Sequence, residues 1–181
     1  MSLFETSVKN RPALQEQLGK KNIHQVPVLD KVIVAMWVGS LATRKWVKDF
    51  SDLEANLRTI TGQQPEMILS KQSISNFKLR EDMPSMLRVT LRWQRAYDFI
   101  ERLVWFVLPR VRDFNGLSER KFDGRGNYNL GLPSQAVFAE LAPEDVKTAM
   151  WLQINICTTA DNDADSKALL TSLWVIFQKK A

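Results

Sequence analysis

The order of predicted helices and strands indicates an α+β fold. Helices and strands follow one another without strict alternation, which argues against a doubly wound sheet. Apolar residues make up 45% of the 181 residues and charged residues 25%, as in globular chains that bury a core. The sequence has no internal repeat, low-complexity segment or linker. We therefore expect a single domain over residues 1–181.

Four helices are predicted, and the second shows the pattern best. Trp46, Phe50, Leu53, Leu57 and Ile60 step by four, three, four and three residues, which places them on one apolar stripe. Glycine follows at position 62 and is a natural helix stop. The predicted helices are 5–19, broken or bent near Pro12; Thr43–Thr61; Gln94–Leu108, ending at Pro109; and one capped by Asn162 or Asp163 that runs to about Phe177.

Strands are predicted where β-branched residues gather or where apolar and polar residues alternate. In residues 86–93, Leu87, Val89, Leu91 and Trp93 fall on one face of an extended chain, and Arg88, Thr90 and Arg92 fall on the other. One face therefore looks buried and the other basic. The predicted extended segments are Lys31–Val38, Met67–Ser75, Met86–Trp93, Ser134–Glu140 and Trp151–Thr159.

Residues 110–131 form a predicted long structured loop. The stretch holds four glycines and five cations. Long loops inside compact domains are usually functional. We expect its cations to contact RNA or protein, and they are Arg110, Arg112, Arg120, Lys121 and Arg125.

Catalytic and metal sites find little support in the residue types present. His24 is the only histidine and Cys157 the only cysteine, so no histidine-based nucleophile pair, zinc site or internal disulfide is expected. No apolar run approaches the ~20 residues that span a bilayer. The first residues lack the pattern of a signal peptide. We expect no enzyme activity, no cofactor, no membrane partner and no small-molecule substrate.

The positive charge is concentrated in the middle of the chain. Residues 71–125 hold twelve Lys or Arg against seven Asp or Glu, an excess equal to the net charge of +5. A basic belt favours a polyanionic partner such as nucleic acid, although a solvated basic surface is the alternative. Cations, an aromatic and a hydroxyl suited to RNA fall in two neighbouring segments: Lys71, Phe77, Lys78, Arg80, Arg88, Thr90 and Arg92.

Several segments together resemble ribosomal protein five of the large subunit, in its bacterial and organellar form, over about residues 10–178. The most specific are two segments in one order, LPRVRDFNGLS at 108–118 and FDGRGNYNLGL at 122–132. The others are VPVLDKVIV (26–34), ITGQQP (60–65), SISNFKLRE (73–81), RVTLR (88–92) and, more weakly, ICTTA (156–160).

The resemblance implies a mixed or antiparallel sheet packed on helices, with one concave face against 5S rRNA. Family positions that touch this RNA map onto Gln63, Phe77 and Thr90. The basic pattern adds Lys71, Arg88 and Arg92 to the expected 5S rRNA interface. The expected setting is the central protuberance, where the family joins 5S rRNA to the large-subunit rRNA beside other 5S-binding proteins.

Two further contacts are implied by the resemblance. A loop over about 73–84 would protrude towards P-site tRNA, with Lys78, Leu79 and Arg80 at its tip. A bridge to small-subunit protein thirteen would lie near Val137–Val146. The expected location is the ribosome of the bacterial cytoplasm, with the mitochondrial matrix as the alternative. A non-ribosomal RNA-binding regulator or assembly factor is the alternative function.

The chain departs from the family pattern at five positions. Ala35 stands where the family usually has Asn, so one polar RNA contact should be missing or replaced. Trp37, Asn76, Asp82 and Trp93 stand where the family usually has Gly. Because only Gly reaches positive φ at low cost, we expect altered strand ends near the two tryptophans.

Overall fold

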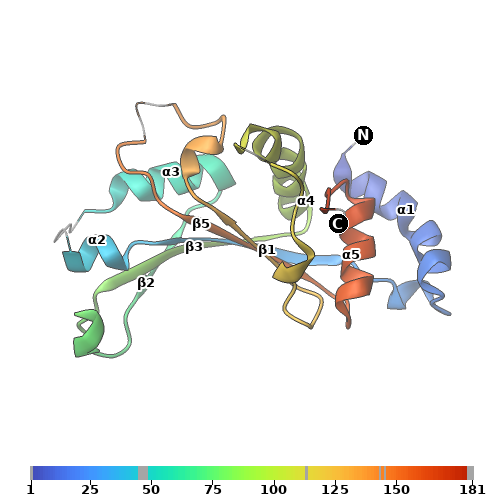
Figure 1. Cartoon of the computed structure of the whole chain (residues 1–181), viewed down its shortest axis with the longest axis horizontal. Coiled ribbons are helices and arrows are strands. Elements are labelled where there is room, and N and C mark those ends of the chain that lie inside the picture. The colour runs from blue at the N-terminus through green and yellow to red at the C-terminus, as the bar shows by residue number, and fades with distance from the viewer. Residues whose placement is uncertain (1, 45–48, 113, 143, 145, 179–181) are drawn as a thin grey trace. The chain divides into compact units, whose positions relative to one another are not determined.

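The computed structural model describes residues 2–44, 49–112, 114–142, 144 and 146–178. Five strands form one sheet in the order β2-β3-β1-β5-β4 (Figure 1), which confirms the α+β class. The strands are β1 (Leu29–Trp37), β2 (Glu66–Leu69), β3 (Pro84–Arg92), β4 (Tyr128–Leu132) and β5 (Leu152–Thr158). The α-helices are α1 (Leu3–Leu18), α2 (Gly39–Arg44), α3 (Ser51–Thr61), α4 (Gln94–Arg102) and α5 (Asp163–Ser172).

The chain divides into two compact units. Unit 1 comprises residues 1–32, 91–130 and 155–181, and unit 2 comprises residues 33–90 and 131–154. The longer strands cross this division, so each contributes one end to each unit. The expectation of a single domain over the whole chain stays a prediction.

Unit 1 is held by helix packing. Helix α1 contacts both α4 and α5. It begins with a capping box, in which Ser2 accepts from the amide of Glu5 and the Glu5 side chain accepts from the amide of Ser2, and it ends at Gly19 with φ 62°. Pro12 lies inside α1, which continues as one helix through that position. A short 3₁₀ turn, Ile23–Gln25, carries the exposed His24 ahead of β1.

Unit 2 is built on the antiparallel pairing of β2 with β3. Glu66 lies opposite Arg88 and Met67 opposite Leu87, with an irregularity at the end of β2. Helix α3 buries Leu53, Leu57 and Ile60, the apolar stripe expected from the sequence. Gly62 ends the helix with φ 68°, as predicted.

The predicted helix Thr43–Thr61 is wrong at its start. Helix α2 already begins at Gly39, and α3 does not begin until Ser51. The Asp49 carboxylate accepts the amide of Ser51 at 2.9 Å, a local bond that competes with continued helix. This bond is also the main reason that the pKa of Asp49 lies below its ordinary value. Trp46 of the predicted stripe lies outside the described residues.

The predicted strand Ser134–Glu140 is wrong. The segment contains a 3₁₀ turn, Gln135–Val137, in which Ser134 accepts the amide of Ala136. The buried Gln135 side chain donates to the Thr148 carbonyl at 2.9 Å and accepts the Met150 amide at 2.7 Å. A side chain therefore satisfies the backbone groups that a neighbouring strand would otherwise pair.

Two helix ends and one strand start also differ from the predictions. Helix α4 stops at Arg102 and gives way to a π-helical turn, Leu103–Val107, and a 3₁₀ turn, Leu108–Arg110. Helix α5 begins after Asn162, as predicted, but ends at Ser172. The predicted long loop 110–131 is structured, and its last residues already belong to β4.

Candidate nucleic-acid interface

The outward face of β3 presents the basic pattern expected from the sequence. Leu87, Val89 and Leu91 are buried, whereas the alternate residues are partly or fully exposed. The prediction that Trp93 shares the buried face is wrong, because β3 ends at Arg92 and Trp93 is 81% exposed. Those alternate residues are Arg88, Thr90 and Arg92. The period of two along an extended chain therefore separates an apolar face from a polar one. Arg88 and Thr90 lie in unit 2, and Arg92 in unit 1.

The structure brings Gln63 and Thr90 together within unit 2. The Gln63 side-chain amide donates to the backbone carbonyl of Thr90 at 3.3 Å. The Thr61 hydroxyl steadies the turn that leads there, because it accepts from the Gln63 amide and donates to the Gln63 carbonyl. Two residues 27 positions apart therefore occupy one patch, and both are partly exposed.

Two of the predicted cations form ion pairs within the chain. Arg88 binds the Glu66 carboxylate at 2.9 Å, and Arg92 binds Asp30 at 3.4 Å. Both pairs are substantially exposed, so each contributes little to stability. They do orient the guanidinium groups and reduce the local positive charge. Sequence reasoning missed both acids, because only the strand register shows that Glu66 lies opposite Arg88.

The β2–β3 loop, residues 70–83, carries most of the other predicted RNA contacts. Figure 1 shows this loop in green, projecting past the ends of β2 and β3. Phe77 is 69% exposed in a 3₁₀ turn, Ser75–Phe77. The cations Lys71, Lys78 and Arg80 are also exposed, whereas Leu79 is half-buried. The prediction that Met67–Ser75 is extended is wrong beyond Leu69, so Lys71 and Phe77 lie on the loop rather than on the sheet face.

Short internal bonds shape the β2–β3 loop. Ile74 and Leu79 form an antiparallel bridge, and Ser70 bonds to Met83 across the base of the loop at 2.8 Å. Lys78 has φ 54° and Asp82 φ 62°. Asp tolerates this left-handed conformation better than most residues, so an aspartate can occupy this position at small cost.

The substituted family positions behave differently from one another. Asp82 and Trp93 keep positive φ, whereas Trp37 and Asn76 are not among the described residues with that conformation. Trp93 has φ 53° and ψ −135°, a region that suits glycine, and its side chain is 81% exposed. Ala35 is buried and offers no polar group to a ligand. The expectation of an altered chain path at these strand ends stays a prediction.

The long loop displays its five predicted cations on the surface of unit 1. Arg110, Arg112, Arg120, Lys121 and Arg125 are all exposed. The turn that carries Arg125 is held by Asp123, which accepts the amides of Arg125 and Asn127 at 2.8 and 3.0 Å. The side-chain bond from Asn127 is the largest reason that the pKa of Asp123 is lowered. The cations are therefore displayed by an ordered frame.

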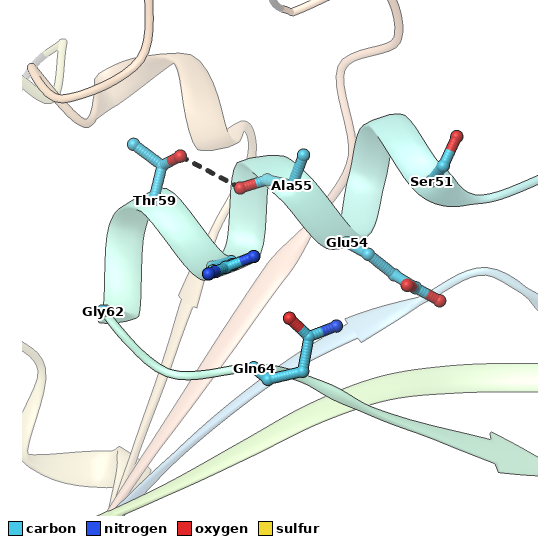
Figure 2. Close-up of a pocket in the computed structure, with 7 residues that line it drawn as sticks. Ser51, Glu54, Ala55, Thr59, Gly62 and Gln64 are labelled. Atoms are coloured by element: carbon cyan, nitrogen blue, oxygen red, sulfur yellow. Dashed lines mark hydrogen bonds between the residues drawn. The ribbon is translucent and has the colours of Figure 1, made fainter.

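Helix α3 and the turn after it line a shallow polar pocket of about 670 Å³. Figure 2 shows Gln64 below the helix, and Thr59 bonded to the carbonyl of Ala55. The lining is completed by Glu54, Arg58, Ser51 and Gly62. The two neighbouring glutamines therefore have different surroundings: Gln64 lines this pocket, whereas Gln63 bonds to β3. The lining offers one carboxylate and one guanidinium but no histidine, cysteine or lysine, so it holds no obvious nucleophile–base pair.

The described residues offer no metal site. They contain no cluster of three or more His, Cys, Asp or Glu able to hold a metal ion. Burial raises the pKa of the Cys157 thiol above its ordinary value, which favours an inert thiol. Within the same part of the chain, no helix is long and apolar enough to cross a bilayer.

Comparison with known proteins identifies the family. One family model, for the C-terminal part of the ribosomal protein L5 family, matches residues 84–177, and a second, for ribosomal protein L5, matches residues 22–80. The chain is 44% identical to the large ribosomal subunit protein uL5 of Natranaerobius thermophilus, with 92% of each chain covered. It is 45% identical to uL5 of Thermotoga maritima, with 93% of this chain and 90% of that protein covered, and 43% identical to uL5 of Microcystis aeruginosa, with 92% of each covered.

The two family models span both units and include the β3 face, residues 70–80 of the β2–β3 loop, and the long loop. The family consists of structural proteins rather than enzymes, which confirms the expectation drawn from the residue types. The exposed polar groups and cations of this chain suit a structural protein that binds RNA. The chain belongs to the ribosomal protein L5 family and is a constituent of the large ribosomal subunit, where its partners are ribosomal RNA and ribosomal proteins.

Proposed function

We propose that the chain binds 5S rRNA through the outward face of β3 and links it to the large-subunit rRNA in the central protuberance. The observation that carries this proposal is the bond between Gln63 and Thr90, flanked by Arg88. Amide and hydroxyl groups suit ribose and base edges, and a guanidinium suits phosphate. The ion pair to Glu66 holds that guanidinium in place before RNA arrives.

Binding of the purified chain to 5S rRNA tests this proposal. We expect tighter binding to 5S rRNA than to an unrelated RNA of equal length, and affinity that falls steeply with salt because cations release counterions from phosphates. Arg88→Ala should weaken binding and reduce the salt slope by about one. Lys21→Ala removes an exposed cation outside the proposed interface and serves as the control. Equal binding to both RNAs, or a flat salt dependence, would contradict the proposal.

The β2–β3 loop is proposed to contact P-site tRNA. Its tip places Lys78 and Arg80 at the surface beside the exposed Phe77. Cations that meet a backbone read shape rather than sequence, which suits a site that accepts any tRNA. Asp82 adds a negative charge close by, so the contact should be weaker than in relatives with glycine there.

Reversal of the two tip charges separates the tRNA contact from the 5S rRNA contact. Lys78→Glu with Arg80→Glu should leave folding and 5S rRNA binding nearly intact and reduce retention of P-site tRNA on assembled ribosomes. Lys21→Glu with Arg95→Glu makes the same charge change at two other exposed positions. Unchanged tRNA retention with failed 5S incorporation would assign the tip to the rRNA interface instead.

The remaining proposals follow from the family. A bridge to small-subunit protein thirteen is proposed near Val137–Val146, and contacts of the long-loop cations with RNA or neighbouring 5S-binding proteins are proposed for unit 1. The bacterial cytoplasm is the proposed compartment, with the mitochondrial matrix as the alternative. Cosedimentation with mature ribosomes distinguishes this constituent role from a further role as a free RNA-binding regulator or assembly factor.

A further inference from the structure

Unit 1 contains an apolar groove of about 660 Å³ that the proposed RNA contacts leave unused. Residues from α1, from the segment before β1, from the start of α4 and from α5 line it. Phe4, Val8, Leu14, Leu29, Tyr97 and Leu169 supply most of its apolar wall. Binding pockets typically have such a volume and such a lining, with only a few polar groups.

One charged side chain lines this groove. Arg11 is half-buried on α1, and its Nε is fully buried without a hydrogen-bond partner among the described residues. An unsatisfied buried donor of this kind costs about 1–3 kcal/mol. The residue as a whole is only half-buried, so a carboxylate bound in the groove would pair with the terminal nitrogens of the guanidinium through charge-assisted hydrogen bonds.

Strained backbone at Trp93 lies on the same groove. Trp93 lines the groove, is 81% exposed and has φ 53° with ψ −135°. Such a conformation costs on the order of 1–3 kcal/mol for a residue other than glycine, and such strain clusters at ligand clamps. The exposed indole of Trp93 provides an apolar surface that a ligand can cover.

We propose that this groove binds a peptide segment of a protein partner, in which large apolar side chains lie next to a carboxylate. The apolar wall suits the side chains, and Arg11 suits the acid. The single cation in the lining matches one carboxylate rather than a run of phosphates, which favours a peptide over RNA. The partner is therefore recognised by an apolar–acidic sequence.

Short peptides test this proposal on the purified full-length chain. The probe is a set of fluorescent, amidated peptides in which Glu stands one, two or three residues from a Leu-Phe pair. We expect at least one of these peptides to bind. The same peptide with Gln in place of Glu should bind at least fivefold more weakly, and the same peptide with Ser-Ser in place of Leu-Phe should not bind. Methyl NMR signals of Leu14, Leu29 and Leu169 should shift on binding. Failure of every Glu peptide, or equal binding of the Gln counterparts, would overturn the proposal.

Variants tie the binding to the groove. Arg11→Gln should abolish the preference for Glu over Gln. Trp93→Gly should relieve strain and raise the melting temperature, yet weaken peptide binding at least fivefold. Trp174→Gly is the matched control, because Trp174 is another exposed tryptophan of unit 1 with φ 65°, outside this groove. Equal loss in both tryptophan variants, or displacement of the peptide by 5S rRNA, would contradict a peptide site here. The direct peptide titrations contain no RNA, so their outcome is independent of the proposed 5S rRNA function; only the displacement arm adds 5S rRNA.

Discussion

The two loops that carry the predicted RNA-contacting cations are held in place by different means. The β2–β3 loop in unit 2 bonds mainly to itself. Ser70 and Met83 close its base, Ile74 and Leu79 bridge it, and the Glu81 amide bonds to Ser73. All but three of its fourteen residues, the base residues 70 and 83 and the bridge residue 79, are exposed. Few buried contacts oppose its opening, so this loop can adapt to a partner.

The long loop in unit 1 is anchored to buried groups instead. Tyr128 is fully buried and donates to the Ser118 carbonyl at 3.0 Å. Phe122 packs edge-on against Tyr128, with ring centroids 4.8 Å apart, and Phe177 contacts both rings. Gly126 donates to the Asp163 carboxylate at 3.0 Å. The loop therefore displays its cations from a rigid base.

The comparison shows that two loops with a similar content of cations can differ in how firmly they are anchored. Both loops look alike as stretches of cations and turn-forming residues. An aromatic cluster fixes one of them, and local hydrogen bonds within the loop fix the other. A substitution in the long loop should therefore change the free energy of unfolding, whereas a substitution at the tip of the β2–β3 loop should change RNA binding alone.

The largest expected effect on stability is that of Gly126→Ala. The new Cβ would lie 2.7 Å from the Ala160 carbonyl oxygen, and φ is +77°. We expect the free energy of unfolding in urea to fall by about 2–4 kcal/mol. Gly124→Ala is the control, since it shares the positive φ but meets no atom within 4 Å, and should cost about 1–2 kcal/mol. Equal losses would show that the close approach to Ala160 is unimportant.

Tyr128 should give a smaller effect with a distinctive pH dependence. Tyr128→Phe leaves the Ser118 carbonyl without its donor and should cost about 1–2 kcal/mol. Burial raises the pKa of Tyr128 to about 12, from about 10 for an exposed phenol. The folded state thus favours the protonated phenol. Its contribution to the free energy of unfolding is present below pH ~10 and is lost as the pH rises from ~10 towards ~12. Urea unfolding of both proteins at pH 8 and pH 11 measures it, and an equal alkaline loss in Tyr128→Phe would exclude the tyrosine as its source.

The smallest expected effect on stability is that of Phe77→Ala. The ring is 69% exposed, so the free energy of unfolding should change by no more than about 0.5 kcal/mol. Binding to 5S rRNA should weaken by about 1–3 kcal/mol if a base stacks on the ring. Thermal unfolding and RNA titration of the same preparation separate the two quantities. A lower melting temperature with unaltered affinity would make Phe77 a structural residue of the loop.

Much of the candidate interface could be predicted from the sequence, because it depends on alternation along one strand. The polar face of β3 follows from the period of two in residues 86–93. The partners of its cations could not be predicted, because Glu66 and Asp30 become neighbours only through strand register and tertiary contacts. The placement of Phe77 on the loop also depended on where β2 ends, and β-propensity does not fix a strand end.

The sequence by itself determined the α+β class, the buried stripe of α3 and the basic face of β3, since periodicity and composition act locally along the chain. Tertiary structure alone decided three features. The Gln135 side chain bonds to the backbone of Thr148 and Met150 where a strand was predicted, Trp93 adopts positive φ, and Arg11 lines an apolar groove. In each of these cases the deciding partner lies elsewhere in the chain or in the packing around the residue. Local propensity contributes only tenths of a kcal/mol per residue, so a few such contacts outweigh it.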